Sequence, residues 1–352
     1  MTKASFQWDP HADQTYNENS DLPLSGTAAS FNKDPGKSFT MDAPGRTLTL
    51  LTSWDEGQTE WGGPPTSNAT SPTVFDVANG TFIYDGAQQH VLYMSHNPRS
   101  TMSFTVRNQA QFRVQNAAGV LMEQPLVINV TQNGSFDVLD TESLVLEGGE
   151  TQITLTDAAK MSALVQGIMQ LGWTQIDVST ASVSSPDVAY ALDLVADSRL
   201  ITYKAKLNFS GASSVRMRTP SLQMDEETLI SISGTAVSHF QFDASSSFIP
   251  AKGSGYVLGS GTARMQFSGY SGGDPFAFTN PNKTYWPKLF TIVSNGVVNG
   301  GELIIQNSEG AAGVAAMLKN GLIAINDEIQ TDASRLNIID DSHGNTHISQ
   351  KN

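Results

Sequence analysis

Residues 126–139 read LVINVTQNGSFDVL and carry the clearest β-signal of the chain. Two runs rich in apolar and β-branched residues, 126–132 and 135–139, flank Asn133-Gly134. An Asn-Gly pair fits the two positive-φ positions of a type I′ turn, whose twist matches that of paired strands. The stretch therefore predicts an antiparallel β-hairpin.

Similar short β-type runs recur on both sides of this stretch, from Thr73 to Thr156 and again from Leu200 to Gln306. Turn residues separate them at the spacing typical of an antiparallel sandwich or barrel. Asn79-Gly80, which is followed by Thr-Phe, resembles Asn133-Gly134, which is followed by Ser-Phe. Two ordinary hairpin turns explain this weak repeat, and this is the favoured interpretation. The alternative is a duplicated sheet unit.

Helix signals are few. An N-cap-like start at Thr156, apolar residues spaced i, i+3, i+4 and i+7 from Met161, and Gly172 as a stop predict a helix near 157–171. A second helix is predicted near 309–319, between a Ser308 cap and the stop signal Asn320-Gly321.

The expected fold class is mainly β, with two β-sandwich or jelly-roll-like modules, a few short helices and an extended N-terminal arm. The boundary between the modules is placed after the loop-like sequence SVSSPD, which begins at residue 182. The expected divisions are an arm over 1–45, modules over 46–190 and 191–340, and a flexible tail over 341–352.

Composition excludes several classes of protein. The 352 residues include no cysteine, so disulfide scaffolds, thiolate metal sites and cysteine nucleophiles are impossible. Thirty-four acidic against 20 basic side chains give a net charge of −14, which argues against direct nucleic-acid binding. Without a membrane-length apolar run or an N-terminal apolar signal segment, the chain is expected to lack a transmembrane segment and to be made in a cytoplasm.

Motifs for catalysis fail on their spacing. Gly36-Lys37-Ser38 lacks the first glycine of a phosphate-binding loop, and the glycines of 253–261 do not fit a dinucleotide-binding fingerprint. His343 and His347 have zinc-like spacing but fall in the expected flexible tail. The sequence therefore predicts no catalytic residue, no metal site, no cofactor and no enzymatic activity.

Two long loops, 54–72 and 268–288, concentrate aromatic side chains. Such loops are usually functional or are ordered by a neighbour. The aromatic side chains could be buried between subunits, which is the favoured interpretation. They could instead pack on their own module or stack on sugars. The candidate binding or intersubunit residues are Trp54, Trp61, Tyr270, Phe276, Phe278, Tyr285 and Trp286.

Uncharged-polar β modules, an extended arm and short helices between strands make the chain resemble virion structural proteins of bacterial viruses, of the jelly-roll capsid or capsid-associated type. The resemblance implies a structural subunit assembled in the host cytoplasm and located in the virion. It would self-assemble through its arm and aromatic loops, as a homotrimer or lattice, and contact other virion proteins. The alternative is a carbohydrate-binding or adhesive module of a fibre or spike, which binds surface glycans through Trp54, Trp61, Tyr285 and Trp286.

Overall fold

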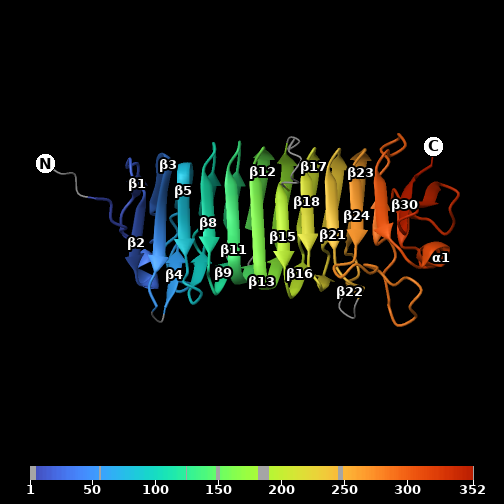
Figure 1. The fold of residues 1–352 in the computed structure, drawn as a ribbon, viewed down its shortest axis with the longest axis horizontal. Coiled ribbons are helices and arrows are strands. Elements are labelled where there is room, and N and C mark those ends of the chain that lie inside the picture. The colour runs from blue at the N-terminus through green and yellow to red at the C-terminus, as the bar shows by residue number, and fades with distance from the viewer. Residues whose placement is uncertain are drawn as a thin grey trace. The chain divides into compact units, whose positions relative to one another are not determined.

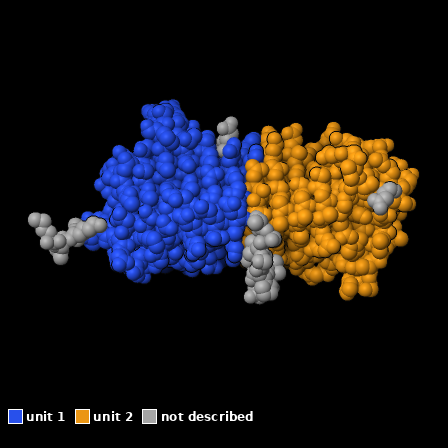
Figure 2. Space-filling view, turned by 90° about the horizontal axis from the view of Figure 1, so that it is seen from above, with its two compact units in different colours: residues 1–175 blue, residues 176–352 orange. Residues whose placement is uncertain are grey.

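The computed structural model describes residues 5–54, 57–123, 125–147, 151–180, 190–244 and 249–351. The chain is mainly β, as the sequence predicts (Figure 1). One α-helix, α1 (Gly310–Lys319), and one short 3-10 helix (Ala28–Phe31) accompany the strands within these ranges. The chain divides into two compact units, residues 1–175 and 176–352 (Figure 2).

The N-terminal unit is built from strands joined by turns and by two longer connections, 27–37 and 62–72. They are β1 (Gln14–Tyr16), β2 (Leu22–Gly26), β3 (Ser38–Thr52), β4 (Gln58–Trp61), β5 (Thr73–Asp85), β6 (Val91–Met94), β7 (Met102–Val106), β8 (Gln111–Gln115), β9 (Gly119–Met122), β10 (Leu126–Val130), β11 (Ser135–Leu146), β12 (Thr151–Asp157) and β13 (Lys160–Gly172). β14 (Thr174–Thr180) contains the boundary between the units.

Each of these strands pairs in parallel with strands one turn of chain away. Thr81 of β5 pairs with Gln111 of β8, and Gln111 pairs in turn with Ser135 of β11. Strands β5, β7 and β10 follow the same rule, as do β4, β6 and β9. A chain whose turns stack in register in this way is a parallel β-helix.

The C-terminal unit is wound by the same rule and ends in antiparallel strands. Its strands are β15 (Leu192–Ala196), β16 (Arg199–Tyr203), β17 (Lys206–Gly211), β18 (Ser214–Arg218), β19 (Leu222–Asp225), β20 (Leu229–Gly234), β21 (Val237–Gln241), β22 (Ile249–Pro250), β23 (Gly255–Gly261), β24 (Arg264–Ser268), β25 (Phe290–Ile292), β26 (Glu302–Gln306), β27 (Ile323–Ile325), β28 (Glu328–Ile329), β29 (Leu336–Asp340) and β30 (Asn345–Gln350). We call β17, β20, β23, β25 and β27, which pair in that order, face A of this unit.

Alternation of side chains explains why these segments fold as stacked strands. Every second residue of a strand points inward, and parallel register places it directly above its partner in the turn below. Phe75 stacks on its register partner Phe104 with ring centroids 5.2 Å apart, and Phe112 lies 5.6 Å from Phe82 and 5.0 Å from Phe136. The core of the N-terminal unit is therefore a column of aromatic rings.

The expected hairpin at 126–139 is wrong, although both of its segments are strands. β10 pairs with β7 and β12, and β11 pairs with β8 and β13, all in parallel. Neither Asn133 nor Gly134 has a positive φ. A Cβ atom on Gly134 would lie 2.7 Å from the Val106 oxygen, so this glycine permits close stacking of turns. The matching Asn79-Gly80 lies at the corresponding corner two turns earlier.

The expected antiparallel sandwich modules are also absent from the described pairings, which are mostly parallel. Antiparallel pairs occur at the C-terminal end, where β30 pairs with β26 and β29, and β27 pairs with β28. The expected module boundary lay between residues 190 and 191, whereas the two compact units divide between Gln175 and Ile176.

The helix expected at 157–171 is wrong, because nearly all of this segment belongs to strand β13. Met161, Ala163 and Val165 alternate inward and are buried, whereas Leu164 and Ile168 point outward and are 39% and 42% exposed. A run of apolar residues on both sides of a strand imitates the helical spacing. The second expected helix, near 309–319, coincides with α1, and Val314, Met317 and Leu318 form its buried side.

The arm and the flexible tail expected from the sequence are both wrong for residues 5–45 and 341–351, the parts of these segments that the structure describes. Instead of reaching away as an arm, the N-terminal segment packs on its own unit: β1 and β2 pair with β3, and the Trp8 ring stacks 6.1 Å from Phe82. The expected flexible tail contains β30, which hydrogen-bonds between two strands. Backbone pairing therefore holds both segments in place.

Candidate functional site

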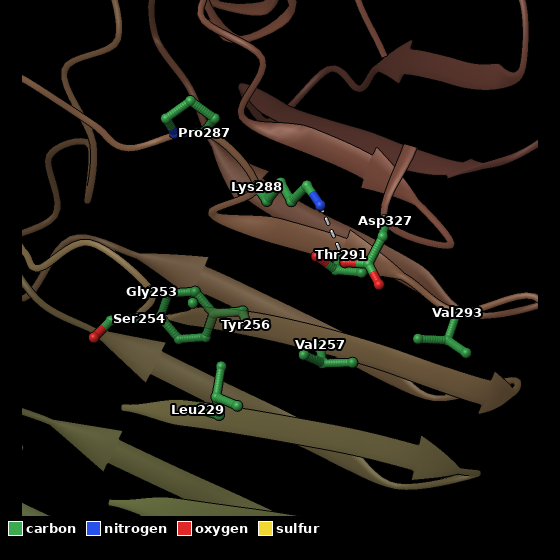
Figure 3. A pocket seen from close by; sticks show the side chains of 11 residues that line it. Leu229, Gly253, Ser254, Tyr256, Val257, Pro287, Lys288, Thr291, Val293 and Asp327 are labelled. Carbon is green, nitrogen blue, oxygen red and sulfur yellow. Dashed lines mark hydrogen bonds and ion pairs between the residues drawn. The ribbon is translucent and has the colours of Figure 1, made fainter. Parts of the chain in front are cut away.

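A groove lined by apolar and polar side chains lies on face A of the C-terminal unit (Figure 3). Its volume is about 360 Å³. Leu229 of β20, Val257 of β23 and Thr291 of β25 point outward into it, since these strands lie side by side in parallel register. Leu229, Val257 and Val293 supply apolar surface, and Pro287 and Lys288 form the wall across from Leu229.

The long connection between β24 and β25 shapes this wall. Because of it, the turn from Tyr256 to its register partner Phe290 is longer than the turn from Leu207 to Ile230. The end of the connection is fixed by hydrogen bonds from Tyr256 N to Leu289 O at 2.8 Å and from Lys288 N to Gly321 O at 2.9 Å. The backbones approach so closely that a Cβ on Gly255 would lie 2.9 Å from Leu289 O.

Polar groups gather along one side of the groove. Lys288 Nζ lies 3.3 Å from Asp327 Oδ1, and both side chains are well exposed. Thr291 faces the groove beside this pair (Figure 3). Ser254 Oγ accepts a hydrogen bond from Thr228 N at 2.9 Å, which fixes the turn that leads into β23. An apolar floor with a few converging polar groups is the usual make-up of a small-molecule site.

The structure separates the seven aromatic residues predicted as a contact or binding set. Trp54 and Trp286 are 75% and 42% exposed, and Trp286 directly precedes the groove residue Pro287. Trp61 is completely buried: its ring stacks 4.5 Å from Phe75, and Nε1 donates to Phe31 O at 3.0 Å. Trp61 thus packs on its own unit and is not available to a sugar.

The aromatic residues of the second loop also pack mainly on their own unit. The Phe276 ring lies 5.1 Å from Phe278 and 5.5 Å from Phe290, and all three are buried. Tyr285 is buried beside them, and its hydroxyl accepts a hydrogen bond from Ala277 N at 3.0 Å. Burial raises the pKa of Tyr285 above its usual value.

Tyr270 has a different neighbour from the rest of this loop. The guanidinium carbon of Arg218 lies 4.6 Å from the centre of its ring, a cation–π contact between β18 and the loop. The sequence prediction did not find the groove itself. Its signals were the glycines at 253 and 255, next to a β-run, and Pro287-Lys288 at the end of the loop.

Two histidines lie between carboxylates outside the groove. His96 Nε2 is 3.1 Å from Glu123, and its ring stacks 4.2 Å from Tyr93. His347, expected in a flexible tail, lies on β30 with Nδ1 2.9 Å from Glu302 and Nε2 3.3 Å from Asp341. Across the described residues, no group of three acidic or histidine side chains is arranged to hold a metal ion.

Comparison with protein families, curated proteins and solved structures gives no match for this chain. In the part of the chain that the structure describes, the helices are too short or too polar to cross a membrane.

Proposed function

We propose that the chain is a structural protein of a virion, of the fibre or spike type, and that it binds a saccharide in the groove on face A. The observation that carries the proposal is the groove itself, with Leu229, Val257 and Val293 on its floor and Lys288, Thr291 and Asp327 along one side. No reaction is part of the proposal.

The chemistry of the groove suits a sugar ring. A pyranose has an apolar face, which can lie on Leu229 and Val257, and hydroxyl groups around its edge. Those hydroxyls can donate to Asp327 and accept from Lys288 or Thr291, which lie on the same side of the groove. The half-exposed Trp286 next to Pro287 offers a stacking surface for a further residue of the saccharide.

A β-helix supports such a site because its wall is rigid. Each groove strand is hydrogen-bonded on both sides: β20 lies between β17 and β23, and β23 lies between β20 and β25. A site on fixed strands keeps its geometry when ligand binds, so little conformational entropy is lost. The virion assignment is supported by the uncharged-polar composition that gives the resemblance to virion proteins.

Saccharide binding is tested with the full-length chain on a glycan array, followed by titration of the strongest glycan. Leu229→Ala and Thr291→Val should each raise the Kd about tenfold, because each removes apolar or hydrogen-bonding contact worth roughly 1–1.5 kcal/mol. Thr49→Val is the matched control: Thr49 is an outward threonine on β3 of the other unit. Identical Kd values for wild type and all three variants would refute the site.

Trp286→Ala and Trp54→Ala form a second matched pair, because both tryptophans are exposed but only Trp286 adjoins the groove. Weaker binding in Trp286→Ala alone supports the proposed position of the saccharide.

The virion assignment has a separate test in the neighbouring genes, where a terminase or packaging ATPase is expected. Mass spectrometry of purified particles should then detect the chain, and its absence from them would remove this part of the proposal.

A further inference from the structure

β29 is an edge strand near the C-terminal end of the chain and pairs with β30, which is labelled in Figure 1. One side of β29 pairs with β30, from Leu336↔Gln350 to Asp340↔Thr346. No strand in the described ranges pairs with its other side. On that side Leu336 N donates to Ala333 O at 3.2 Å. The backbone groups of Ile338 and Asp340 beyond it are a template for adding another strand.

The residues of β29 do little to protect this edge. Folded proteins usually block an open edge with proline, lysine, a bulge or a very short strand. The sequence of β29 is LNIID, without proline or lysine, and its five pairs with β30 run without a register shift. Ile339 is 64% exposed, the largest fraction for any isoleucine or leucine among the described side chains.

The edge is complementary to itself. When two copies of β29 run antiparallel about Ile338, Ile338 faces Ile338 of the second copy and Leu336 faces Asp340. One step outward, Arg335 faces Asp341 of the second copy, so opposite charges meet at both ends of the pairing. Arg335 also lies 2.5 Å from Glu328 of its own chain, so the guanidinium would bridge two carboxylates. Opposite charges and β-branched pairs directly across an antiparallel ladder are stabilising.

The same register brings the exposed isoleucines together. Asn337 and Ile339 lie on one face of the strand, and Ile339 of each copy is the diagonal neighbour of the other across the ladder. The contact would cover the most exposed isoleucine of the described chain with its own equivalent. An isologous two-fold pairing closes after two copies, so it gives a dimer and not an open fibre.

We propose that two copies of this chain form a dimer by antiparallel pairing of their β29 edges, with Ile338 on the two-fold axis. This interface does not depend on the groove or on saccharide binding. It also differs from the assembly expected from the sequence, in which the arm and the aromatic loops made the contacts.

The dimer is tested on the full-length chain by sedimentation and by light scattering over a range of concentrations. Ile339→Lys places a charge next to its equivalent and should raise the dimer Kd at least about tenfold. Val297→Lys is the matched control, because Val297 is 76% exposed in the same unit but lies outside β29. A chain that stays monomeric up to about 200 µM, or a dimer equally sensitive to both variants, overturns the proposal.

Crosslinking tests the register. The chain has no cysteine, so Ile338→Cys introduces a single thiol at the position that faces itself. Directly opposed residues of an antiparallel ladder come within the range of a disulfide bond. Mild oxidation should convert the Ile338→Cys chain, but not the Val297→Cys control, to a covalent dimer. A yield no higher than that of the control would refute the two-fold pairing even if a dimer forms.

Discussion

Replacing Lys33 with methionine should remove a pH dependence from the stability of the N-terminal unit. Lys33 is 0% exposed, and its ammonium donates to Ala12 O at 2.7 Å, Asp9 O at 2.9 Å and Gln14 Oε1 at 3.1 Å. The Trp8 ring centre is 4.8 Å from Nζ. This buried lysine therefore ties the N-terminal segment to the first turns of the β-helix.

Burial lowers the pKa of Lys33 from 10.5 to about 8, although nearby Asp9, Asp13 and Asp34 partly oppose the shift. The folded state thus binds this proton less tightly than the unfolded state, so the free energy of unfolding rises with pH between about 8 and 10.5. At 1.36 kcal/mol per pKa unit, the full difference is about 3.4 kcal/mol. Between pH 7 and pH 9 the expected gain is about 1.3 kcal/mol.

Urea unfolding at pH 7, 8 and 9 measures this gain for the wild type and for Lys33→Met. Subtracting the two series removes the contribution of other titrating groups, and the difference should change by about 1.3 kcal/mol over the range. Lys160→Met, at a half-buried lysine that begins β13 of the same unit, should keep the wild-type slope. A Lys33→Met series that runs parallel to the wild type within about 0.3 kcal/mol would refute the reasoning.

Three further predictions concern stability. Tyr256→Phe should raise the free energy of unfolding by about 1 kcal/mol in urea, because the buried Tyr256 hydroxyl has no hydrogen-bond partner within the described structure. Trp61→Ala should lower it by about 3–5 kcal/mol through the cavity left in the aromatic column, whether or not saccharide is bound. Burial lowers the pKa of His347, but hydrogen bonds to Glu302 and Asp341 outweigh it, so the pKa is raised overall. Protonated His347 therefore stabilises the folded state; this stabilisation is complete below about pH 6.5 and is lost as the pH rises through the folded pKa. The difference in melting temperature between wild type and His347→Ala should accordingly shrink from pH 6 to pH 8.

Sequence patterns located many strands but could not say which strands pair. The runs at 126–130 and 135–139 are strands, yet alternation looks the same in an antiparallel hairpin and in a parallel turn. Pairing in a β-helix depends on residues one turn away, and turn length varies, being much shorter from Leu200 to Leu222 than from Tyr256 to Phe290. Irregular turns of this kind conceal the repeat that would otherwise reveal the fold.

The candidate site was harder to predict because residue type does not determine exposure. Trp54 and Trp61 lie close together in one presumed loop, but Trp61 ends β4 and points inward whereas Trp54 is exposed. The alternation of polar Gln58 and Glu60 with Thr59 and Trp61 was the available signal for that strand. The groove depends on the approach of segments far apart in sequence, which no local pattern records.

The low charge content, 15% of the chain, follows from the stacking geometry. Strands of adjacent turns lie about 4.8 Å apart, so an outward side chain has a register neighbour above and below at contact distance. Repeated like charges in such a column repel each other, and uncharged or opposite partners relieve this cost. Asp85 accordingly faces Gln115, whose amide donates to it at 2.8 Å, and Asp193 faces Arg216 at 2.6 Å. Amides and opposite charges are thus the partners that let an acidic protein stack its outward carboxylates in register.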